Sequence, residues 1–217
     1  MTAVIIGAGD FPRKAYPRYL IGTADIVICC DSALKAYLAA MPSIFGKERL
    51  PDAVVGDMDS LPRALQKKYS DILVKVTEQE HNDQTKAFTH LMSLGLPLDT
   101  VHFIGITGKR ADHTIGNLSL LMEYGKRFDL EGISIDAVSD YETVIPVWDS
   151  VSLMVGKGRK VSILSPDNSL KISCEGLMYD TSGVVFDNWW KATLNIATED
   201  EIKLNFSHHS SALICLN

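Results

Sequence analysis

The stretch Asp52-Ala53-Val54-Val55-Gly56-Asp57-Met58-Asp59-Ser60 places two carboxylates directly after a short apolar run. An apolar run of this length, bounded by turn residues, is typical of a buried strand. The same arrangement occurs earlier in the chain, where Asp31 follows Ile26-Val27-Ile28-Cys29-Cys30. Parallel strands of an open sheet end at a common edge, and ligands bind at that edge. The sequence therefore predicts a sheet edge at which Asp31, Asp57 and Asp59 converge.

Strands and helices alternate around this stretch up to about residue 145. Further strands are expected over 4–6, 72–76 and 101–104, and helices over 33–40 and 85–94, with a last helix that takes Asp112 as N-cap and carries Ile115, Leu118 and Met122 on one face. Such alternation indicates a mostly parallel sheet covered by helices. Residues 1–145 are therefore expected to form a Rossmann-like α/β/α domain.

The remainder of the chain has a different pattern. Short runs with strand character, separated by Gly, Asp and Asn, are found at 151–154, 160–164, 170–173, 184–186, 192–196 and 202–206. No helical period of useful length accompanies them. Evenly spaced short strands are typical of an all-β sandwich or barrel. Residues 146–217 are therefore expected to form a second, smaller all-β domain.

The composition limits the classes of function. A chain of 217 residues that is 46% hydrophobic can form real cores, and its formal net charge of -6 argues against a general surface for nucleic acid or for an anionic membrane. The cysteines have neither a zinc-ligand spacing nor a disulfide framework; they are Cys29, Cys30, Cys174 and Cys215. The amino terminus lacks the pattern of a signal peptide. A cytoplasmic protein is expected.

Asp57 and Asp59 are candidate metal ligands. In extended backbone, residues two apart point to one side, and two like charges so close are costly unless a cation lies between them. Magnesium suits such a site because it binds through one or two carboxylates together with substrate phosphates. Asp83 could complete the site. The alternative is a solvated turn with an Asp cap, and for Asp83 a helix N-cap cluster.

The segment Gly108-Lys109-Arg110-Ala111-Asp112-His113 is a candidate anion site. It joins a glycine turn, two cations and a helix N-terminus within a few residues. The guanidinium of Arg110 suits bidentate contact with phosphate. The alternative is that Asp112 is only a helix cap and that His113 faces solvent.

Trp189 and Trp190 are adjacent in the second domain. Neighbouring residues of a strand face opposite sides, so one indole is expected to pack inward and the other to be exposed. An exposed indole can bind a cationic ring. The alternative is that both are core or interface aromatics, and Trp148 is expected to be a packing residue.

The order and spacing of these motifs resemble the thiamine pyrophosphokinase family. The matching segments are Gly56 to Ser60, Gln79 with Asp83 and Lys86-Ala87, Gly108 to His113 with Asn117, Lys160 to Leu164, Gly176 to Tyr179, and Thr193 to Asn195. Three positions depart from the family pattern. Ser32 follows Asp31 where glycine is usual, Lys109 replaces a second glycine, and Leu194 replaces a common serine.

The resemblance implies an enzyme that transfers diphosphate from ATP to thiamine, with Mg²⁺ as cofactor and AMP as product. It further implies a homodimer whose active sites lie between subunits. Asp57, Asp59 and Asp83 would hold the metal, Arg110 would contact phosphate and Asp112 would position thiamine. Other residues with expected substrate or cofactor contacts are Asp31, Lys86, Gly108, Lys109, His113, Asn117, Trp189, Trp190, Thr193 and Asn195.

Three alternatives stay open at this point. One is a diphosphokinase for another hydroxymethyl heterocycle, such as a pterin. Another is a nucleotide-sugar transferase with an Asp-x-Asp motif, which leaves the Gly108–His113 segment and the β domain unexplained. The third is a non-catalytic nucleotide or thiamine sensor, which predicts a missing metal acid. The general base is not identified from sequence, although Asp59 or Asp83 could take the proton.

Overall fold

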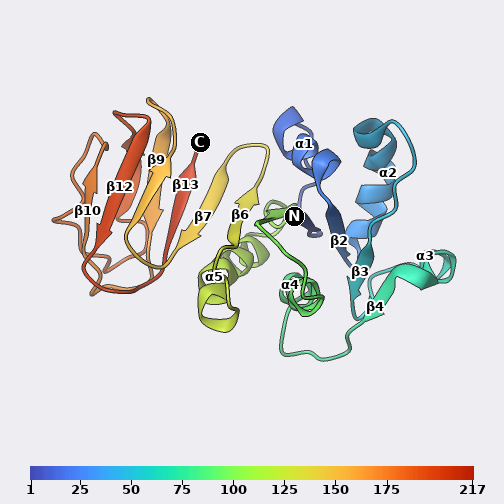
Figure 1. The fold of residues 1–217 in the computed structure, drawn as a ribbon. Helices are drawn as coiled ribbons and strands as arrows, with labels where there is room; N and C mark the ends of the chain where they lie inside the picture. Colours follow the sequence, from blue (N-terminus) through green and yellow to red (C-terminus); the bar gives the residue numbers. More distant parts are fainter. The chain divides into compact units, whose positions relative to one another are not determined.

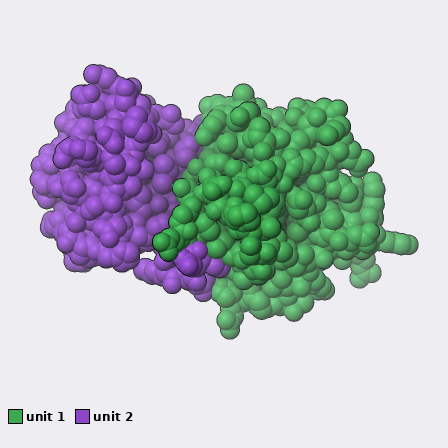
Figure 2. Space-filling model, in the orientation of Figure 1, with its two compact units in different colours: residues 1–120, 130–140 green, residues 121–129, 141–217 purple.

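The computed structural model describes residues 1–217, which form two compact units. Residues 1–120 and 130–140 make the first unit, and residues 121–129 and 141–217 make the second (Figure 2). The expected boundary at residue 145 falls inside strand β7 (Thr143–Val147). The second unit includes the last turns of a helix because Trp148 packs on them. Its Nε1 donates to the carbonyl of Met122 at 2.7 Å, as expected for a packing residue.

The first unit contains a parallel sheet. Its strands are β1 (Thr2–Ile6), β2 (Ile26–Cys30), β3 (Ala53–Gly56), β4 (Leu73–Lys75), β5 (Thr100–Ile104) and β6 (Ser134–Val138). They lie in the order β6-β5-β1-β2-β3-β4, and each neighbouring pair runs parallel (Figure 1). This confirms the mostly parallel sheet. The chain order reverses between β1 and β5, which makes the loops after these strands the switch point of the sheet.

Helices connect these strands. They are α1 (Ala15–Thr23), α2 (Ala33–Phe45), α3 (Arg63–Lys68), the 3₁₀ turn η1 (Ser70–Ile72), α4 (Asp83–Ser93) and α5 (Ala111–Arg127). The apolar spacing in α4 correctly predicted its buried face, which packs on β1, β2 and β3. The rings of Phe88 and Phe103 meet edge-on there, with centroids 5.3 Å apart. Asn82 caps α4 by accepting from the N–H of Thr85 at 3.0 Å.

Helix α5 differs from the expectation. It begins at Ala111, so Asp112 lies in its first turn instead of at the N-cap. Met122 is buried, whereas Ile115 is exposed. The three-residue and four-residue spacing marks one face of the helix correctly, but burial of that face depends on which elements cover it. None of the helices has the length and apolar character needed to cross a membrane.

The second unit is an antiparallel β domain, as expected. One set of strands, in the order β11-β9-β13-β7, comprises β11 (Ala192–Ile196), β9 (Lys160–Leu164), β13 (Ala212–Leu216) and β7. A second sheet has the order β10-β12-β8, with β10 (Ile172–Glu175), β12 (Glu201–Phe206) and β8 (Val151–Met154). Buried residues of both sets, among them Val161, Ile202 and Ile214, form one core cluster. Inward-facing residues alternate with outward-facing ones along each strand, so the apolar faces of the two sets of strands pack against each other.

The expected strand at 184–186 is absent. The chain between β10 and β11 consists of turns, in which the N–H of Val184 donates to the carbonyl of Thr181. Thr181 and Phe186 are the buried residues of this segment. Trp189 and Trp190 lie in this turn region, and 42% and 53% of their surfaces are exposed. The prediction that one indole faces the core is wrong, because alternation of faces applies only within a strand.

Candidate active site

Asp31 and Asp83 meet at the carboxyl edge of β2 and β3. The N–H of Asp31 donates to the carbonyl of Val55 at 2.9 Å, which continues the pairing of the two strands past the end of β2. A Cβ placed on Gly56 would lie 2.8 Å from the Cβ of Asp31 and 3.2 Å from Oδ1 of Asp83. Glycine at this position therefore allows the two acidic side chains to approach the end of β3.

The Asp31 carboxylate is buried without full hydrogen bonding. The residue is only 1% exposed. Its Oδ2 accepts from the N–H of Ser60 at 3.2 Å, while Oδ1 has no hydrogen-bond partner. Burial raises the pKa of Asp31; the N–H of Ser60 opposes this shift, and the charges of Asp83, Asp57 and Asp59 add to it. The structure thus brings these four acids within electrostatic range of one another.

Asp83 has a similar environment. Burial raises its pKa, the ammonium of Lys86 opposes the shift, and the charge of Asp57 adds to it. Lys86 is one turn further along α4, with Nζ 4.0 Å from Oδ1 of Asp83, and its side chain is almost fully buried. A carboxylate with a raised pKa is a better proton acceptor than an ordinary one. Asp83 therefore combines partial exposure with increased basicity.

The segment Asp57-Met58-Asp59 is a turn, not extended chain. Met58 has φ 69°, in the left-handed region that side chains rarely adopt, and Oδ1 of Asp57 accepts from the N–H of Asp59 at 3.0 Å. This hydrogen bond is the main cause of the lowered pKa of Asp57, and Nε2 of Gln79 adds a weaker contact at 3.4 Å. The capped-turn alternative is thus observed. Asp57 is both a capping residue and part of the acidic edge, a name used here for Asp31, Asp57, Asp59 and Asp83 at the carboxyl ends of β2 and β3.

The acidic edge fits a divalent cation that arrives together with phosphate. No three Asp, Glu, His or Cys side chains are grouped as a ready-made metal centre. Mg²⁺ does not need such a group, because it usually keeps several waters and binds through one or two carboxylates plus substrate phosphates. The oxygen-only donor set and the partnerless Oδ1 of Asp31 also suit a hard cation. Asp57, Asp59 and Asp83 could hold it.

Two glycine loops lie at the switch point between β1 and β5. The N–H of Gly9 donates to the carbonyl of Gly105 at 2.6 Å, and that of Asp10 donates to the carbonyl of Thr107 at 2.8 Å. A Cβ on Gly9 would lie 2.2 Å from the Thr107 carbonyl oxygen, so only glycine permits this approach. In open parallel sheets, ligands bind at such a switch point. The loops are therefore a candidate ligand site.

Asn117 and Lys109 hold the second of these loops. Asn117 donates to the carbonyl of Ile106 at 2.7 Å and accepts from Nδ2 of Asn82 at 2.8 Å, which links α5 to the start of α4. Lys109 has φ 55°, and its Nζ donates to the carbonyl of Ala8 at 2.7 Å across the switch point. Both side chains have protein partners in this structure.

Arg110 and Asp112 form an exposed ion pair. Nε of Arg110 donates to Oδ1 of Asp112 at 3.1 Å, and Nη2 makes a second, shorter contact with Oδ2. The Arg110 contact lowers the pKa of Asp112 to about 2. Asp112 also accepts from the N–H of His113, whose side chain is exposed, and Gly108 leads into this segment with φ 83°. Phosphate binding by Arg110 requires it to share or exchange its present partner.

In the second unit, Asn195 is a buried structural residue. It is 4% exposed, donates to the carbonyl of Tyr179 at 2.7 Å and accepts from the N–H of Tyr179 at 3.0 Å. Its amide thus shapes the Tyr179 turn. Thr193 and the exposed Leu194 precede it on β11, and Leu194 has φ 65°.

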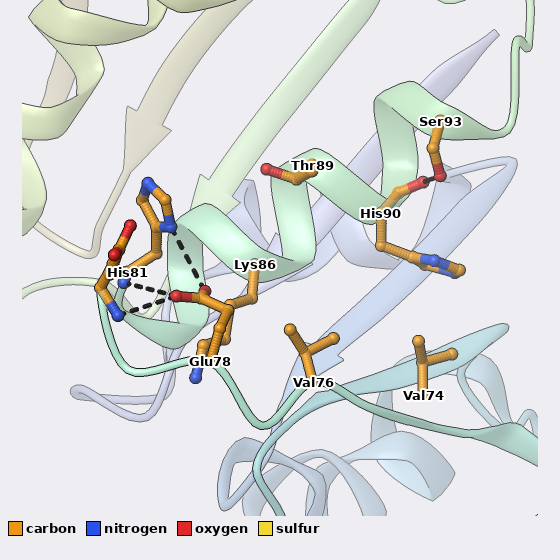
Figure 3. A pocket seen from close by; sticks show the side chains of 9 residues that line it. Val74, Val76, Glu78, His81, Lys86, Thr89, His90 and Ser93 are labelled. Atoms are coloured by element: carbon orange, nitrogen blue, oxygen red, sulfur yellow. Dashed lines mark hydrogen bonds and ion pairs between the residues drawn. The ribbon is translucent and has the colours of Figure 1, made fainter.

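A cavity of about 540 Å³ lies beside α4 (Figure 3). Val74 and Val76 form one side, and Thr89 and His90 of α4 face them across the cavity. Glu78 and His81 lie at one end of the cavity, and Ser93 lies at the other (Figure 3). The full lining is Val74, Val76, Glu78, Glu80, His81, Lys86, Thr89, His90 and Ser93. The sequence carries no motif for this cavity, because its lining comes from β4, the loop after it and a face of α4, which only the fold brings together.

Two family models match the chain. The model described as the thiamin pyrophosphokinase catalytic domain covers residues 17–132, and the one described as the thiamin pyrophosphokinase substrate-binding domain covers residues 143–213. Among curated proteins, thiamine pyrophosphokinase 1 of Arabidopsis thaliana is 27% identical over 131 residues, which is 52% of this chain and 49% of that protein. Thiamine pyrophosphokinase 1 of rice (Oryza sativa subsp. japonica) is 25% identical over 138 residues, 56% of this chain and 52% of that protein. The chain thus spans about half the length of the curated relatives it matches.

Solved structures show the same fold. The thiamine pyrophosphokinase of Bacillus subtilis superposes with a TM-score of 0.76 at 19% identity, covering 100% of this chain and 99% of that one. The thiamin pyrophosphokinase of Candida albicans superposes with a TM-score of 0.79 at 13% identity, covering 98% and 89%. Because the two family models match in order and together span most of the sequence, the chain belongs to the thiamin pyrophosphokinase family.

Proposed function

We propose that the protein transfers the diphosphate group of ATP to the hydroxyl of thiamine, giving thiamine diphosphate and AMP, with Mg²⁺ as cofactor. The observation that carries the proposal is the meeting of Asp31 and Asp83 at Gly56, beside the acidic turn at Asp57 and Asp59. The family models support the choice of thiamine as acceptor, because one is described as catalytic and the other as substrate-binding.

The residues of the proposed site perform positioning and charge neutralisation, which are the main tasks in phosphoryl transfer. Mg²⁺ held by Asp57, Asp59 and Asp83 would supply positive charge to the phosphate oxygens. The glycine loops at the switch point, which contain Gly9 and Gly105, would lie beside the triphosphate. Arg110 would donate in bidentate fashion to phosphate, and its pairing with Asp112 keeps the guanidinium near the loop.

We further propose Asp83 as the acceptor of the thiamine hydroxyl proton. Its carboxylate remains partly exposed at the sheet edge, where a substrate hydroxyl could reach it. Asp31 also has a raised pKa, but it is too deeply buried to meet a substrate hydroxyl. Asp31 would instead increase the negative potential that attracts the cation. Lys86, Lys109, His113 and Asn117 would line the nucleotide side.

Thiamine binding is assigned to residues 146–217, and diphosphate transfer to residues 1–145. The exposed indoles of Trp189 and Trp190 offer a face on which the cationic thiazolium ring can stack. The proposed assembly is a homodimer with its active sites between the subunits, in which the partner subunit contributes the indole of Trp189 or Trp190. Thr193 and Asn195 would also contact thiamine. A reducing compartment such as the cytoplasm is proposed because all four cysteines are free.

The proposal is tested by incubating the protein with ATP, Mg²⁺ and thiamine and measuring AMP and thiamine diphosphate. Equal amounts of the two products are expected. A 6-hydroxymethylpterin replaces thiamine in a parallel reaction, where no AMP is expected. Formation of ADP, or AMP that does not depend on thiamine, would contradict the proposed reaction.

A further inference from the structure

Gln66 lies on α3 and contacts the acidic turn. Its Nε2 donates to the carbonyl of Met58 at 2.8 Å and to the carbonyl of Leu61 at 2.7 Å. Helix α3 has only six residues, none of them buried, and buried Leu61 and Tyr69 flank it. The two amide hydrogen bonds connect α3 directly to the backbone of the acidic turn and of the residue that follows it.

The turn held by Gln66 is conformationally demanding. Met58 lies between two acids, Asp57 and Asp59, in the left-handed region, which residues with side chains rarely adopt. Such a conformation persists only where surrounding contacts determine it. On the other side of the turn, the N–H of Ser60 donates to Asp31. Two sets of contacts therefore fix the acidic turn. On the β2 side the N–H of Ser60 binds Asp31, and on the α3 side the carbonyls of Met58 and Leu61 bind Gln66.

We propose that Gln66 is a positioning residue for diphosphate transfer, which holds the carbonyls of Met58 and Leu61 and thereby sets the positions of Asp57 and Asp59. This inference rests on the function proposed above. Gln66 is matched to the task because a primary amide provides two N–H donors on a neutral group. A carboxylate of the same shape provides none and would repel the two carbonyls.

The experiment compares Gln66→Met, Gln66→Glu and a matched control, Lys67→Met, on the neighbouring exposed position of α3. Hydrogen exchange of the Asp59 and Ser60 amides is measured by NMR, together with kcat and KM for ATP and for thiamine. Gln66→Met is expected to speed exchange of both amides at least tenfold and to lower kcat/KM for ATP by 10- to 100-fold, because small misplacements of reacting groups have effects of this size. The KM for thiamine is expected to stay within twofold.

Gln66→Glu is expected to speed amide exchange and to lower kcat/KM for ATP more than Gln66→Met does. It removes the two N–H donors, as Gln66→Met does, and its carboxylate also repels the carbonyls of Met58 and Leu61. A role in packing alone predicts two equally mild variants with wild-type exchange at Asp59 and Ser60, and this result would overturn the proposal. Lys67→Met should match wild type in every measurement. Hydrogen exchange needs no turnover, so a failure of the proposed reaction in the wild-type protein is distinguishable from a failure of the Gln66 inference.

Discussion

Asp31 and Asp83 approach the same glycine from two elements of the fold, since a Cβ on Gly56 would lie 2.8 Å from the Cβ of Asp31 and 3.2 Å from Oδ1 of Asp83. One acid follows β2 and the other opens α4. Burial raises the pKa of both, and neighbouring carboxylates increase the shift. Concentrating like charges in this way is unfavourable for the fold, and it is typical of sites that place charge for function.

Asp31→Asn is expected to stabilise the protein at pH 7 and to impair it as an enzyme. The pKa of a carboxyl of this kind is higher in the folded state than its value of about 3.9 in the unfolded state. Such a group lowers the free energy of unfolding progressively as the pH rises from about 3.9 through the folded-state pKa. At pH 7 this loss of folding stability is complete. Calorimetry should show a melting temperature about 2–4 °C higher, the shift that about 1 kcal/mol produces in a chain of this size.

The advantage of Asp31→Asn should disappear below about pH 3, where the wild-type carboxyl is protonated in both states. Turnover should fall at least tenfold, because the negative potential at the sheet edge is reduced. A variant that melts below wild type at pH 7 would show that burial of the Asp31 charge is compensated by contacts with the protein.

Asp57→Asn, Asp59→Asn and Asp83→Asn are each expected to lower kcat by two or more orders of magnitude without altering the circular dichroism spectrum. Chelation of divalent cations should abolish wild-type activity, and added Mg²⁺ should restore it. Asp71→Asn is the control, because this exposed acid lies in the turn η1, away from the edge residues. Near-normal rates in all three variants would exclude a metal role for these acids.

Arg110→Lys is expected to lower kcat/KM for ATP by 10- to 100-fold, because a lysine cannot make the bidentate contact with phosphate. Arg110 lowers the pKa of Asp112 to about 2, so the pair stays ionised throughout the usual assay range. The ratio of wild-type to variant rates should therefore be constant between about pH 5 and pH 9. Arg63→Lys, on the exposed start of α3, provides the control. A pH-dependent ratio would indicate that a different titrating group is affected.

Trp189→Ala or Trp190→Ala is expected to raise the KM for thiamine at least tenfold and to leave the KM for ATP within twofold. Both indoles are exposed, so truncation should change the melting temperature little. Thiamine should quench wild-type tryptophan fluorescence and quench it less in the variant with the larger KM. In contrast, Trp148→Ala should destabilise the fold, because Trp148 packs on the end of α5. Unchanged thiamine kinetics in both exposed-indole variants would refute the stacking role.

Leu194→Gly is expected to raise the melting temperature by about 2–4 °C. Leu194 has φ 65° and is 81% exposed, so the substitution relieves an unfavourable backbone conformation and removes little buried surface. The hydrogen bond that the backbone N–H of residue 194 donates to Oγ of Ser162 is retained in the variant. Leu194→Ala serves as the control, because alanine has the same backbone restriction and should melt like wild type. Equal stabilisation by alanine would assign the effect to the exposed side chain instead.

Elements with a strong local pattern were predictable. The buried runs of β2 and β3 and the apolar spacing of α4 needed no knowledge of their neighbours, because burial on both faces of a parallel sheet requires continuous apolar runs. The strand at 184–186 was predicted wrongly, because three apolar residues in a row have no distinctive period, and of the three only Phe186 is fully buried. The short helices α1 and α3 were missed for the same lack of periodic signal.

The sequence alone determined that acids follow successive parallel strands and that two glycine loops share their edge, because strand direction places all these segments on one side of the sheet. Only the tertiary structure decided that Asp31 and Asp83 meet at Gly56, that Asn195 is bound to Tyr179, and that Gln66 holds the acidic turn. The same applies to the left-handed backbone of Met58. These features depend on contacts between residues distant in the chain, which local patterns of hydrophobicity and charge do not encode.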